Sequence, residues 1–425
     1  MKIEIKKWLY PGIGVKRWIF LVLVSLILIS AGISILINFQ IIGELERKVI
    51  QLFSPIVGYV PYGLDIIISS ILILAGLLGV NYSFRGALKR FYQLESHEFV
   101  SKLYEKKVLE KGPKVVALGG GTGLSNLLRG LKLYTSNITA IVTVADDGGS
   151  SGKLRDELGM LPPGDIRNCL VALADAEPLM QELFQYRFNS EGHLEGHSFG
   201  NLFIASLTEV LGDFEEAIKE SSKVLAIRGQ VLPATNDDVH LGAIYSDKSV
   251  KMGESVIPDN EKRIEKVFLE PTDCQPTIDA VKAIREAEVI VIGPGSLYTS
   301  IIPNLLVDDI AEEIKKSKAT RIYVSNVMTQ PGETTGYTVS DHIKAINNHS
   351  FTDLFNYVIV NKEESSEDLI QKYKEEGAYR VNVDREEIKD MGIQIVEGDL
   401  LSEQGYIRHD PMELARIIFN IVESR

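Results

Sequence analysis

The stretch that decides the fold is Lys114–Gly152, KVVALGGGTGLSNLLRGLKLYTSNITAIVTVADDGGSSG. A short β-branched run, Lys114–Leu118, leads into a glycine-rich turn and a helical pattern over Leu124–Leu133, and a second β-branched run follows at Ile138–Ala145. A strand, a turn, a helix and a second strand make up the unit from which parallel sheets are built. The sequence therefore predicts an α/β fold that begins near Lys114.

The same alternation continues to the C-terminus. Further strands are predicted at Glu288–Ile292, Arg321–Ser325 and Tyr357–Val360, with helical stretches between them. Such a pattern is typical of a Rossmann-like, mostly parallel sheet with helices on both faces. Residues Val239–Val256 alternate polar and apolar side chains around turns, which predicts a small β-hairpin insert. Because the carboxyl ends of parallel strands share one edge, the loops after them are expected to meet there.

Composition narrows the class of protein. The 425 residues are 45% hydrophobic and 24% charged, which excludes a disordered or collagen-like polymer. The net charge of -13 argues against nucleic acid as a partner, because phosphates would be repelled. The two cysteines, Cys169 and Cys274, form no CxxC motif, so neither a disulfide framework nor a thiolate metal cluster is indicated.

Two apolar runs precede the α/β region. Trp18–Ile37 contains no charged residue and is long enough for a helix to cross a bilayer. Leu64–Val80 is a second apolar run, with one acid, Asp65, at its start. An export signal has a shorter apolar core, so residues 1–82 are predicted to be an uncleaved anchor with two transmembrane helices. Lys and Arg gather before the first run and after the second. Both termini and the main domain are therefore expected in the cytoplasm, at the cell membrane.

The remaining chain divides into a linker and the main domain. Residues 83–112 are charged and helix-prone and end in Gly112 and Pro113, which predicts a juxtamembrane helix and linker. Residues 113–425 are predicted to form the α/β domain.

The first loop, Gly119–Gly123, is a candidate phosphate site. Glycine allows a ligand to approach the backbone, and free N–H groups at the start of the following helix attract an anion. The loop lacks the Lys-Ser/Thr of a Walker A motif, and Leu124 stands where GxGxxG requires its last glycine. A purely structural turn is the alternative.

The second loop begins with Asp146 and Asp147, after the second predicted strand. An acid at this place binds a ribose hydroxyl in dinucleotide-binding folds. The pair can also hold Mg²⁺ together with a bound phosphate, or cap the turn. The glycines and serines that follow, Gly148–Ser151, suit an anion nest.

Two further segments carry polar residues at helix starts. In PPGDIRN, Asp165 is placed as a helix N-cap, and Arg167 follows in the first turn, where a cation is unfavourable. Arg167 is thus either held for an anion or an ordinary surface arginine. In GHLEGHSFGN, the H-x-E-x-H spacing does not match the HExxH zinc motif, and Asn201 is the better ligand-binding candidate.

Loops after the later strands, Gly293–Ser300 and Asn326–Thr335, offer amides, hydroxyls and carboxamides at the same edge. No GxSxG, HExxH or thiolate-base pattern indicates covalent catalysis. The candidate nucleotide- or phosphate-binding residues are Gly119, Gly120, Gly121, Thr122, Gly123, Asp146, Asp147, Gly148, Gly149, Ser150, Ser151, Asp165, Arg167, Asn168, Asn201, Gly293, Gly295, Ser296, Tyr298, Asn326, Thr329, Gln330 and Arg408. Asp146 and Asp147 are also the candidate Mg²⁺ ligands.

Seven motifs, in this order, carry a resemblance to a known family: VVALGGGTGLSNLLRGLK, VTVADDGGSSGKLR, LPPGDIRNCLVALAD, HSFGNLFIASL, GQVLPATNDDV, GPGSLYTSIIPNLLV and YVSNVMTQPGETTGY. They resemble the bacterial gluconeogenesis factor family (YvcK-like), within the superfamily of 2-phospho-L-lactate transferase (CofD-like). The resemblance begins near Lys114 and runs to the C-terminus.

This resemblance implies a Rossmann-like domain that binds a UDP-sugar, notably UDP-N-acetylglucosamine, and supports cell shape and gluconeogenic growth without a settled catalytic activity. The transferase, which uses a guanosine nucleotide donor and Mg²⁺, is the enzyme alternative. This chain shares Gly120–Gly123, Asp147 and Gly293-Pro294 with the transferase but departs from it in the second loop, PPGDIRN and HSFGN. The expected partners are a UDP-sugar, the lipid bilayer and cell-wall synthesis proteins, with a second copy of the chain as a further candidate.

Overall fold

The computed structural model describes residues 16–37, 64–92, 107–175, 178–189, 192–258, 262–363, 365–403 and 406–424. The chain divides into two compact units, Met1–Glu105 and Lys106–Arg425.

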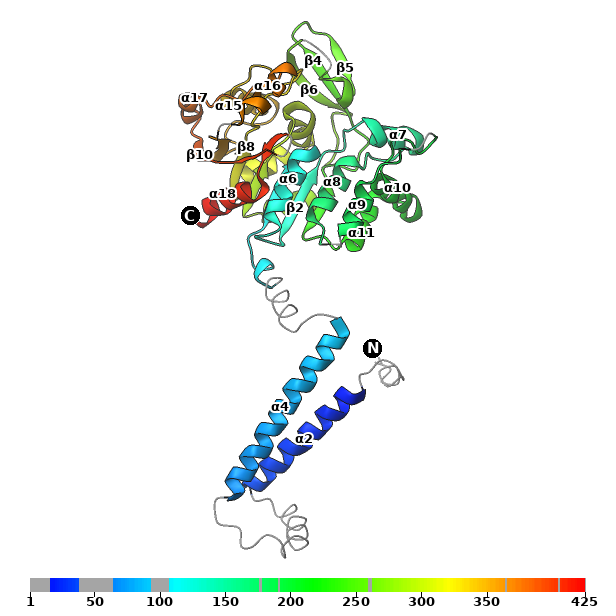
Figure 1. Ribbon diagram of the computed structural model, residues 1–425. Coiled ribbons are helices and arrows are strands. Elements are labelled where there is room, and N and C mark those ends of the chain that lie inside the picture. Colours follow the sequence, from blue (N-terminus) through cyan, green and yellow to red (C-terminus); the bar gives the residue numbers. More distant parts are fainter. Residues whose placement is uncertain are drawn as a thin grey trace, which may run out of the picture. The chain divides into compact units, whose positions relative to one another are not determined.

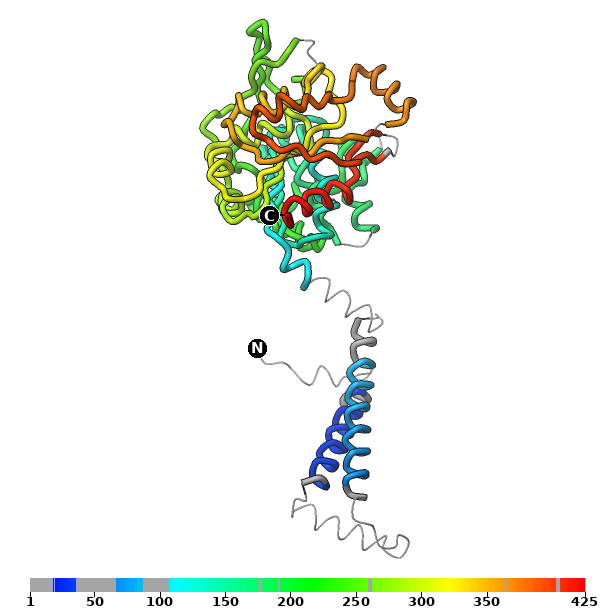
Figure 2. Tube along the Cα trace, turned by 90° about the vertical axis from the view of Figure 1, so that its left-hand side faces the viewer, coloured from blue at the N-terminus to red at the C-terminus, as the bar shows by residue number. Residues whose placement is uncertain are grey.

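In the first unit, helices α2 (Lys16–Ile37) and α4 (Leu64–Tyr92) lie side by side (Figures 1 and 2). Small residues allow their backbones to approach closely. A Cβ atom added to Gly76 would lie 2.7 Å from the carbonyl oxygen of Ser25 and 2.4 Å from the Ile29 side chain. Glycine at this position is therefore a condition of the packing.

Length and composition support one of the two predicted spans. Among the described residues, Ile66–Gly86 is the one helical segment long and apolar enough to cross a membrane, and the apolar part of α2, Phe20–Ile35, is shorter. By length and composition of the described helices, the prediction of two spans is therefore not supported.

The predicted linker does not start as a separate helix. Helix α4 continues without a break to Tyr92, so the beginning of 83–112 belongs to it. Residues 93–106 lie outside the described residues, as do Lys2, Lys6 and Lys7, which enter the predicted orientation.

A seven-stranded sheet forms the centre of the second unit, and all its neighbouring strands are parallel. The order is β10-β9-β8-β7-β1-β2-β3, so the direction of winding reverses between β1 and β7. This is the doubly wound arrangement, and it confirms the α/β prediction. The strands are β1 (Val115–Gly119), β2 (Ile138–Val142), β3 (Gln230–Pro233), β7 (Val289–Ile292), β8 (Thr320–Val324), β9 (Tyr357–Asn361) and β10 (Gln394–Gly398).

Helices pack in two layers because right-handed crossovers on either side of the reversal point place them on opposite faces. In one layer α6 (Gly121–Leu131) contacts both α8 (Gly164–Leu173) and the C-terminal α18 (Pro411–Glu423). In the other, α12 (Ile278–Glu286) contacts α14 (Ile310–Lys316). The remaining helices are α7 (Gly149–Leu158), α9 (Pro178–Gln185), α10 (Phe199–Leu211), α11 (Phe214–Leu225), α13 (Ile302–Leu306), α15 (Val339–His349), α16 (Glu367–Glu375) and α17 (Arg385–Asp390), with helical turns η1 (Glu254–Val256) and η2 (Leu297–Ile301).

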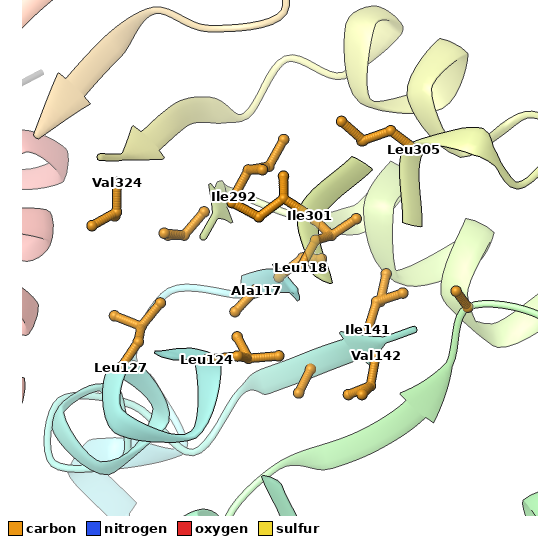
Figure 3. Packing of buried hydrophobic residues seen from close by; sticks show 14 of the residues in the cluster. Ala117, Leu118, Leu124, Leu127, Ile141, Val142, Ile292, Ile301, Leu305 and Val324 are labelled. Atoms are coloured by element: carbon orange, nitrogen blue, oxygen red, sulfur yellow. The ribbon is translucent and has the colours of Figure 1, made fainter. Parts of the chain in front are cut away.

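The core lies between these layers and the sheet. Figure 3 shows Leu124 and Leu127 of α6 and Ile301 of η2 packed around strand residues such as Leu118 and Ile292, all of them fully or almost fully buried. Burial of apolar area at about 25 cal/mol per Å² is the main stabilising contribution of such a core. It also fixes the strand ends from which the site loops extend.

The insert is larger than the predicted hairpin. It is a three-stranded antiparallel sheet in the order β5-β4-β6, with β4 (His240–Tyr245), β5 (Val250–Met252) and β6 (Ile264–Glu270). The prediction stopped at Val256 because IEKVFLE is rich in charge and its pairing with β4 spans a long connection. A short ribbon of β11 (Leu401–Glu403) and β12 (Ile407–His409) precedes α18.

Candidate functional site

A cavity of about 270 Å³ opens at the carboxyl ends of β1, β7 and β8, where the winding of the sheet reverses. Open α/β sheets bind their ligands in this crevice. Its walls are formed by Gly120, Gly121, Thr122, Gly123, Asn126, Pro294, Gly295, Ser296, Ser300, Asn326, Val327, Met328, Gln330, Ile407, Arg408 and His409. A larger cavity, about 530 Å³, lies at the opposite, amino ends of the strands near Lys114 and Glu286, and that edge is not where such folds bind ligands.

The cavity brings together predicted residues from four separate segments. Those that line it are Gly120, Gly121, Thr122, Gly123, Gly295, Ser296, Asn326, Gln330 and Arg408. Predicted residues that are not among its lining are Gly119, Asp146, Asp147, Gly148, Gly149, Ser150, Ser151, Asp165, Arg167, Asn168, Asn201, Gly293, Tyr298 and Thr329. Ser300 and Met328 line the cavity and belong to the two predicted loops, although neither was named as a candidate residue. Asn126 lies in helix α6 and was not predicted, because only the tertiary packing places it there.

The glycine loop starts α6 at the mouth of the cavity. Gly121 has a φ of +60°, a backbone conformation that favours glycine. At Gly123, an added Cβ would lie 2.3 Å from the carbonyl oxygen of Pro294, so only glycine lets the first loop approach the loop after β7. The N–H groups of the first helical turn have no partner inside the helix, and such groups attract an anion.

One of these N–H groups is already bound. The Gly121 N–H donates a hydrogen bond to the carboxylate of Asp165 at 2.6 Å. Asp165 stands in the first turn of α8, whose N-cap is Pro163, so the prediction of Asp165 as the N-cap is wrong. Its carboxylate reaches across to a different helix instead. A phosphate at this loop is therefore left with the N–H groups of Thr122 and Gly123.

Burial raises the pKa of Asp165 to about 6, and the nearby negative charge of Asp146 adds to the effect. The Gly121 N–H and the positive charge of Arg167 act in the opposite direction. Burial likewise raises the pKa of Glu254 to about 8 and that of Glu333 to about 7. Two of these carboxyl groups contact lining residues of the cavity, Asp165 through the Gly121 N–H and Glu333 through Gln330 Nε2.

The predicted Mg²⁺ ligands have structural partners. Asp146 Oδ1 accepts a hydrogen bond from the Gly148 N–H at 2.9 Å, and Asp147 Oδ1 accepts one from the Ser255 N–H at 2.8 Å. The first contact caps the turn, and the second ties it to the insert. Among the described residues, no group of three or more His, Cys, Asp or Glu side chains is arranged to hold a metal ion.

Residues predicted from the PPGDIRN and HSFGN motifs join helices α7, α8 and α10. The Ser150 hydroxyl lies 3.1 Å from His197 Nδ1 and accepts a hydrogen bond from Asn201 Nδ2 at 3.1 Å. Arg167 is buried and donates to Ser198 Oγ and to Asn168 Oδ1, so it is not an ordinary surface arginine. Burial lowers the pKa of Arg167 to about 10.

The loops after β7 and β8 are tied to each other. The Gly295 N–H donates to Asn326 Oδ1 at 3.2 Å, and Asn326 Nδ2 donates to the Gly295 carbonyl at 2.8 Å. Ser296 Oγ donates to Gln330 Oε1 at 2.7 Å. This wall of the cavity is therefore held in place before a ligand arrives. Deeper in the same loops, the hydroxyl of Tyr298 lies 2.8 Å from that of Tyr337.

The fourth wall comes from β12. Asn126 Nδ2 donates to the His409 carbonyl and so joins α6 to this strand. Burial lowers the pKa of His409 to about 4, which keeps its ring neutral. Arg408 lies 5.3 Å from the ring centre of Tyr406 and, among the described lining residues, is the one Lys or Arg side chain.

The doubly wound α/β sheet places this chain in the Rossmann-like class of proteins. Its cavity at the reversal point has helix N–H groups on one wall and an arginine on another, which are groups suited to an anion. The sequence model of 2-phospho-L-lactate transferase CofD matches residues 115–401. The gluconeogenesis factor of Bacillus subtilis is 51% identical over 313 residues, which cover 73% of this chain and 99% of that protein. The chain therefore belongs to the gluconeogenesis factor family, within the CofD-like superfamily.

Two further comparisons differ in how much of this chain they cover. A crystal structure of a UPF0052 family protein from Bacillus halodurans, 50% identical, has a TM-score of 0.71 and covers 73% of this chain and 99% of that one. That share is close to the share of the second unit alone. A relative from Clostridium acetobutylicum, 46% identical, covers 98% of this chain and 92% of its own length, so its match extends into the first unit.

Proposed function

We propose that this chain is a membrane-anchored regulatory protein that binds a UDP-sugar, with UDP-N-acetylglucosamine as the first ligand to test. The observation that carries the proposal is the convergence of Gly120–Gly123, Ser296, Gln330 and Arg408 around one cavity at the reversal point of the sheet. Helix N–H groups and an arginine suit the two charges of a diphosphate. The amide and hydroxyl groups suit the sugar and the base.

Regulation is favoured over catalysis by what lines the cavity. Among the described lining residues there is neither a carboxylate nor a thiol, and the one histidine has a neutral, buried ring. The match to a transferase family favours the alternative, a nucleotide-dependent transferase. Incubation with UDP- and GDP-linked donors, Mg²⁺ and candidate acceptors discriminates the two, because turnover supports the transferase.

The proposal of a membrane anchor is based on the first unit, which buries small polar side chains between its helices and exposes large apolar ones. Ser25 and Ser69 are buried between α2 and α4, whereas the side chains of Ile27 and Ile66 are 66% and 63% exposed. A helix pair in water buries its large apolar side chains, whereas a pair in lipid packs through small residues. The arrangement supports a hairpin in which α2 crosses the bilayer together with α4. Such an anchor would hold the ligand-binding unit in the cytoplasm close to cell-wall synthesis proteins.

The binding proposal is tested by calorimetry of the full-length chain in detergent micelles. UDP-N-acetylglucosamine and UDP-glucose are expected to bind saturably and at least about tenfold more tightly than NAD or GDP. Absence of heat with both UDP-sugars, or equal affinity for NAD, contradicts the proposal.

A further inference from the structure

Gln330 lines the cavity, and both the oxygen and the nitrogen of its side-chain amide form hydrogen bonds within the protein. Ser296 Oγ donates to Gln330 Oε1 at 2.7 Å, and Gln330 Nε2 donates to Glu333 Oε1 at 2.6 Å. A carboxamide has two N–H groups and two acceptor positions. One N–H and one lone pair of Gln330 therefore stay available for a ligand.

Glu333 decides which way this amide points. Its carboxylate also accepts from the Tyr298 N–H at 3.0 Å and from Thr299 Oγ1 at 3.2 Å. The side chain is 3% exposed and has no ion pair among the described residues. An ionised carboxylate can only accept, so the opposite orientation would set the Gln330 oxygen against it. The Ser296 hydroxyl can either donate or accept a hydrogen bond, so it does not fix the orientation of the Gln330 amide.

We infer that Gln330 is a specificity-determining residue, oriented by Glu333, which reads the donor and acceptor pattern of the base of a nucleoside diphosphate. This inference rests on the proposed function. A free N–H beside a free lone pair matches a ring carbonyl next to a ring N–H, as in uracil and guanine. In cytosine and adenine an amino group and a ring nitrogen take the places of that carbonyl and that N–H, so donor and acceptor are exchanged. For a base that its ribose and diphosphate hold in one orientation, this exchanged pattern does not match the Gln330 amide. Glu333 is a positioning residue in this scheme.

The substitution Glu333→Gln reverses the amide. The introduced carbonyl keeps the bond from the Tyr298 N–H, which turns the introduced NH₂ group towards Gln330. Gln330 then faces it with its own oxygen, and the Ser296 hydroxyl accepts instead of donating. The donor and the acceptor presented to the cavity exchange places, and the preferred base pattern changes with them.

The experiment compares UDP with CDP, which share charge and ribose, by calorimetry of the full-length chain in detergent. The pH is 8, above the Glu333 pKa of about 7, so that the ionised carboxylate prevails. The wild type is expected to prefer UDP about tenfold, because an unmatched hydrogen bond costs about a factor of ten or more. Glu333→Gln is expected to bring the UDP/CDP ratio to one or below. Gln330→Leu is expected to bring it close to one. Glu312→Gln, on the exposed face of α14, is the matched control and should keep the wild-type ratio.

Each outcome has one meaning. A Glu333→Gln chain that weakens UDP and CDP equally, or a Gln330→Leu chain that keeps the wild-type ratio, overturns the inference and leaves UDP-sugar binding intact. A wild type that binds neither nucleotide overturns the proposed function and the inference together. Melting temperatures are measured for every variant, and if Glu333→Gln does not fold, the Gln330→Leu ratio decides.

Discussion

The carboxylate of Asp165 accepts a hydrogen bond from the backbone N–H of Gly121 at 2.6 Å, and this contact joins the first turns of α8 and α6. The protein thus places one of its own negative charges where helix N–H groups attract anions. A bound diphosphate would lie beside this carboxylate, so protonation of Asp165 and binding of the ligand should favour each other.

The affinity for a UDP-sugar is therefore expected to rise as the pH falls from 8 through about 6, the raised pKa of Asp165. The diphosphate diester of a UDP-sugar does not titrate in this range, so the change reports the protein. Asp165→Asn should bind more tightly than the wild type at pH 8 and should show a flatter pH profile in calorimetry. Equal profiles for the two chains would contradict this coupling.

The Asp165 carboxyl group also affects the free energy of unfolding, and its raised pKa decides how this free energy changes with pH. Asp165 binds its proton more tightly in the folded state, with a pKa of about 6 against 3.8, so its stabilising contribution is full below 3.8 and is lost as pH rises through 6. Asp165→Asn should gain on the order of 1–3 kcal/mol of unfolding free energy at pH 8 and nothing at pH 4. Asp156→Asn, an exposed site on α7, is the control for denaturant titrations.

Contact between the first loop and the loop after β7 predicts a loss of binding for Gly123→Ala. The new Cβ would lie 2.3 Å from the Pro294 carbonyl oxygen, so the two walls must separate. We expect at least a tenfold weaker UDP-sugar affinity and a loss of about 1–3 kcal/mol in stability. Gly119→Ala is the matched control, because its Cβ meets its nearest neighbour at 3.5 Å and should change both quantities little. Similar losses in the two variants would refute the role of close approach.

Local sequence patterns were sufficient to predict the inner strands of the seven-stranded sheet but not its edge strands. Strands such as β1 and β7 are buried along their whole length and show as continuous apolar runs. In the edge strand β10, QIVEG, the polar Gln394 and Glu397 are exposed and only two apolar residues stand between them, so no such run marks it. Its place beside β9 depends on pairing across the sheet.

The candidate site divides in the same way. Gly121 and Ser296 could be predicted because they follow strands directly in sequence, and parallel strands bring such loops to one edge. Asn126 could not, because its role depends on β12 lying beside α6, a contact between distant segments. Asp147 was predicted for its chemistry, but the insert provides the partner that occupies its carboxylate.

Arg408 is expected to supply most of the positive charge that a diphosphate meets. Arg408→Gln should weaken UDP-sugar binding about tenfold and should leave the affinity for uridine, which has no phosphate, nearly unchanged. The wild-type affinity should also fall with added salt more steeply than that of the variant, because Arg408 is exposed and its charge is screened. Arg416→Gln, at an exposed pair with Glu413 on α18, is the control. A loss of uridine binding equal to that of the UDP-sugar would assign Arg408 a purely structural role.

The inside-out hairpin makes a prediction that a soluble helix pair does not share. Ile27 lies near the middle of α2 with 66% of its surface exposed. In water, Ile27→Asp would be neutral or improve solubility, whereas in lipid a buried carboxylate costs about 2.5–3.5 kcal/mol or more. The full-length chain is therefore expected to stay with the membrane after an alkaline carbonate wash, Ile27→Asp to be partly released, and the control Ile27→Leu to behave like the wild type. Release of the wild type itself, or equal retention of all three chains, would show that α2 does not cross the bilayer.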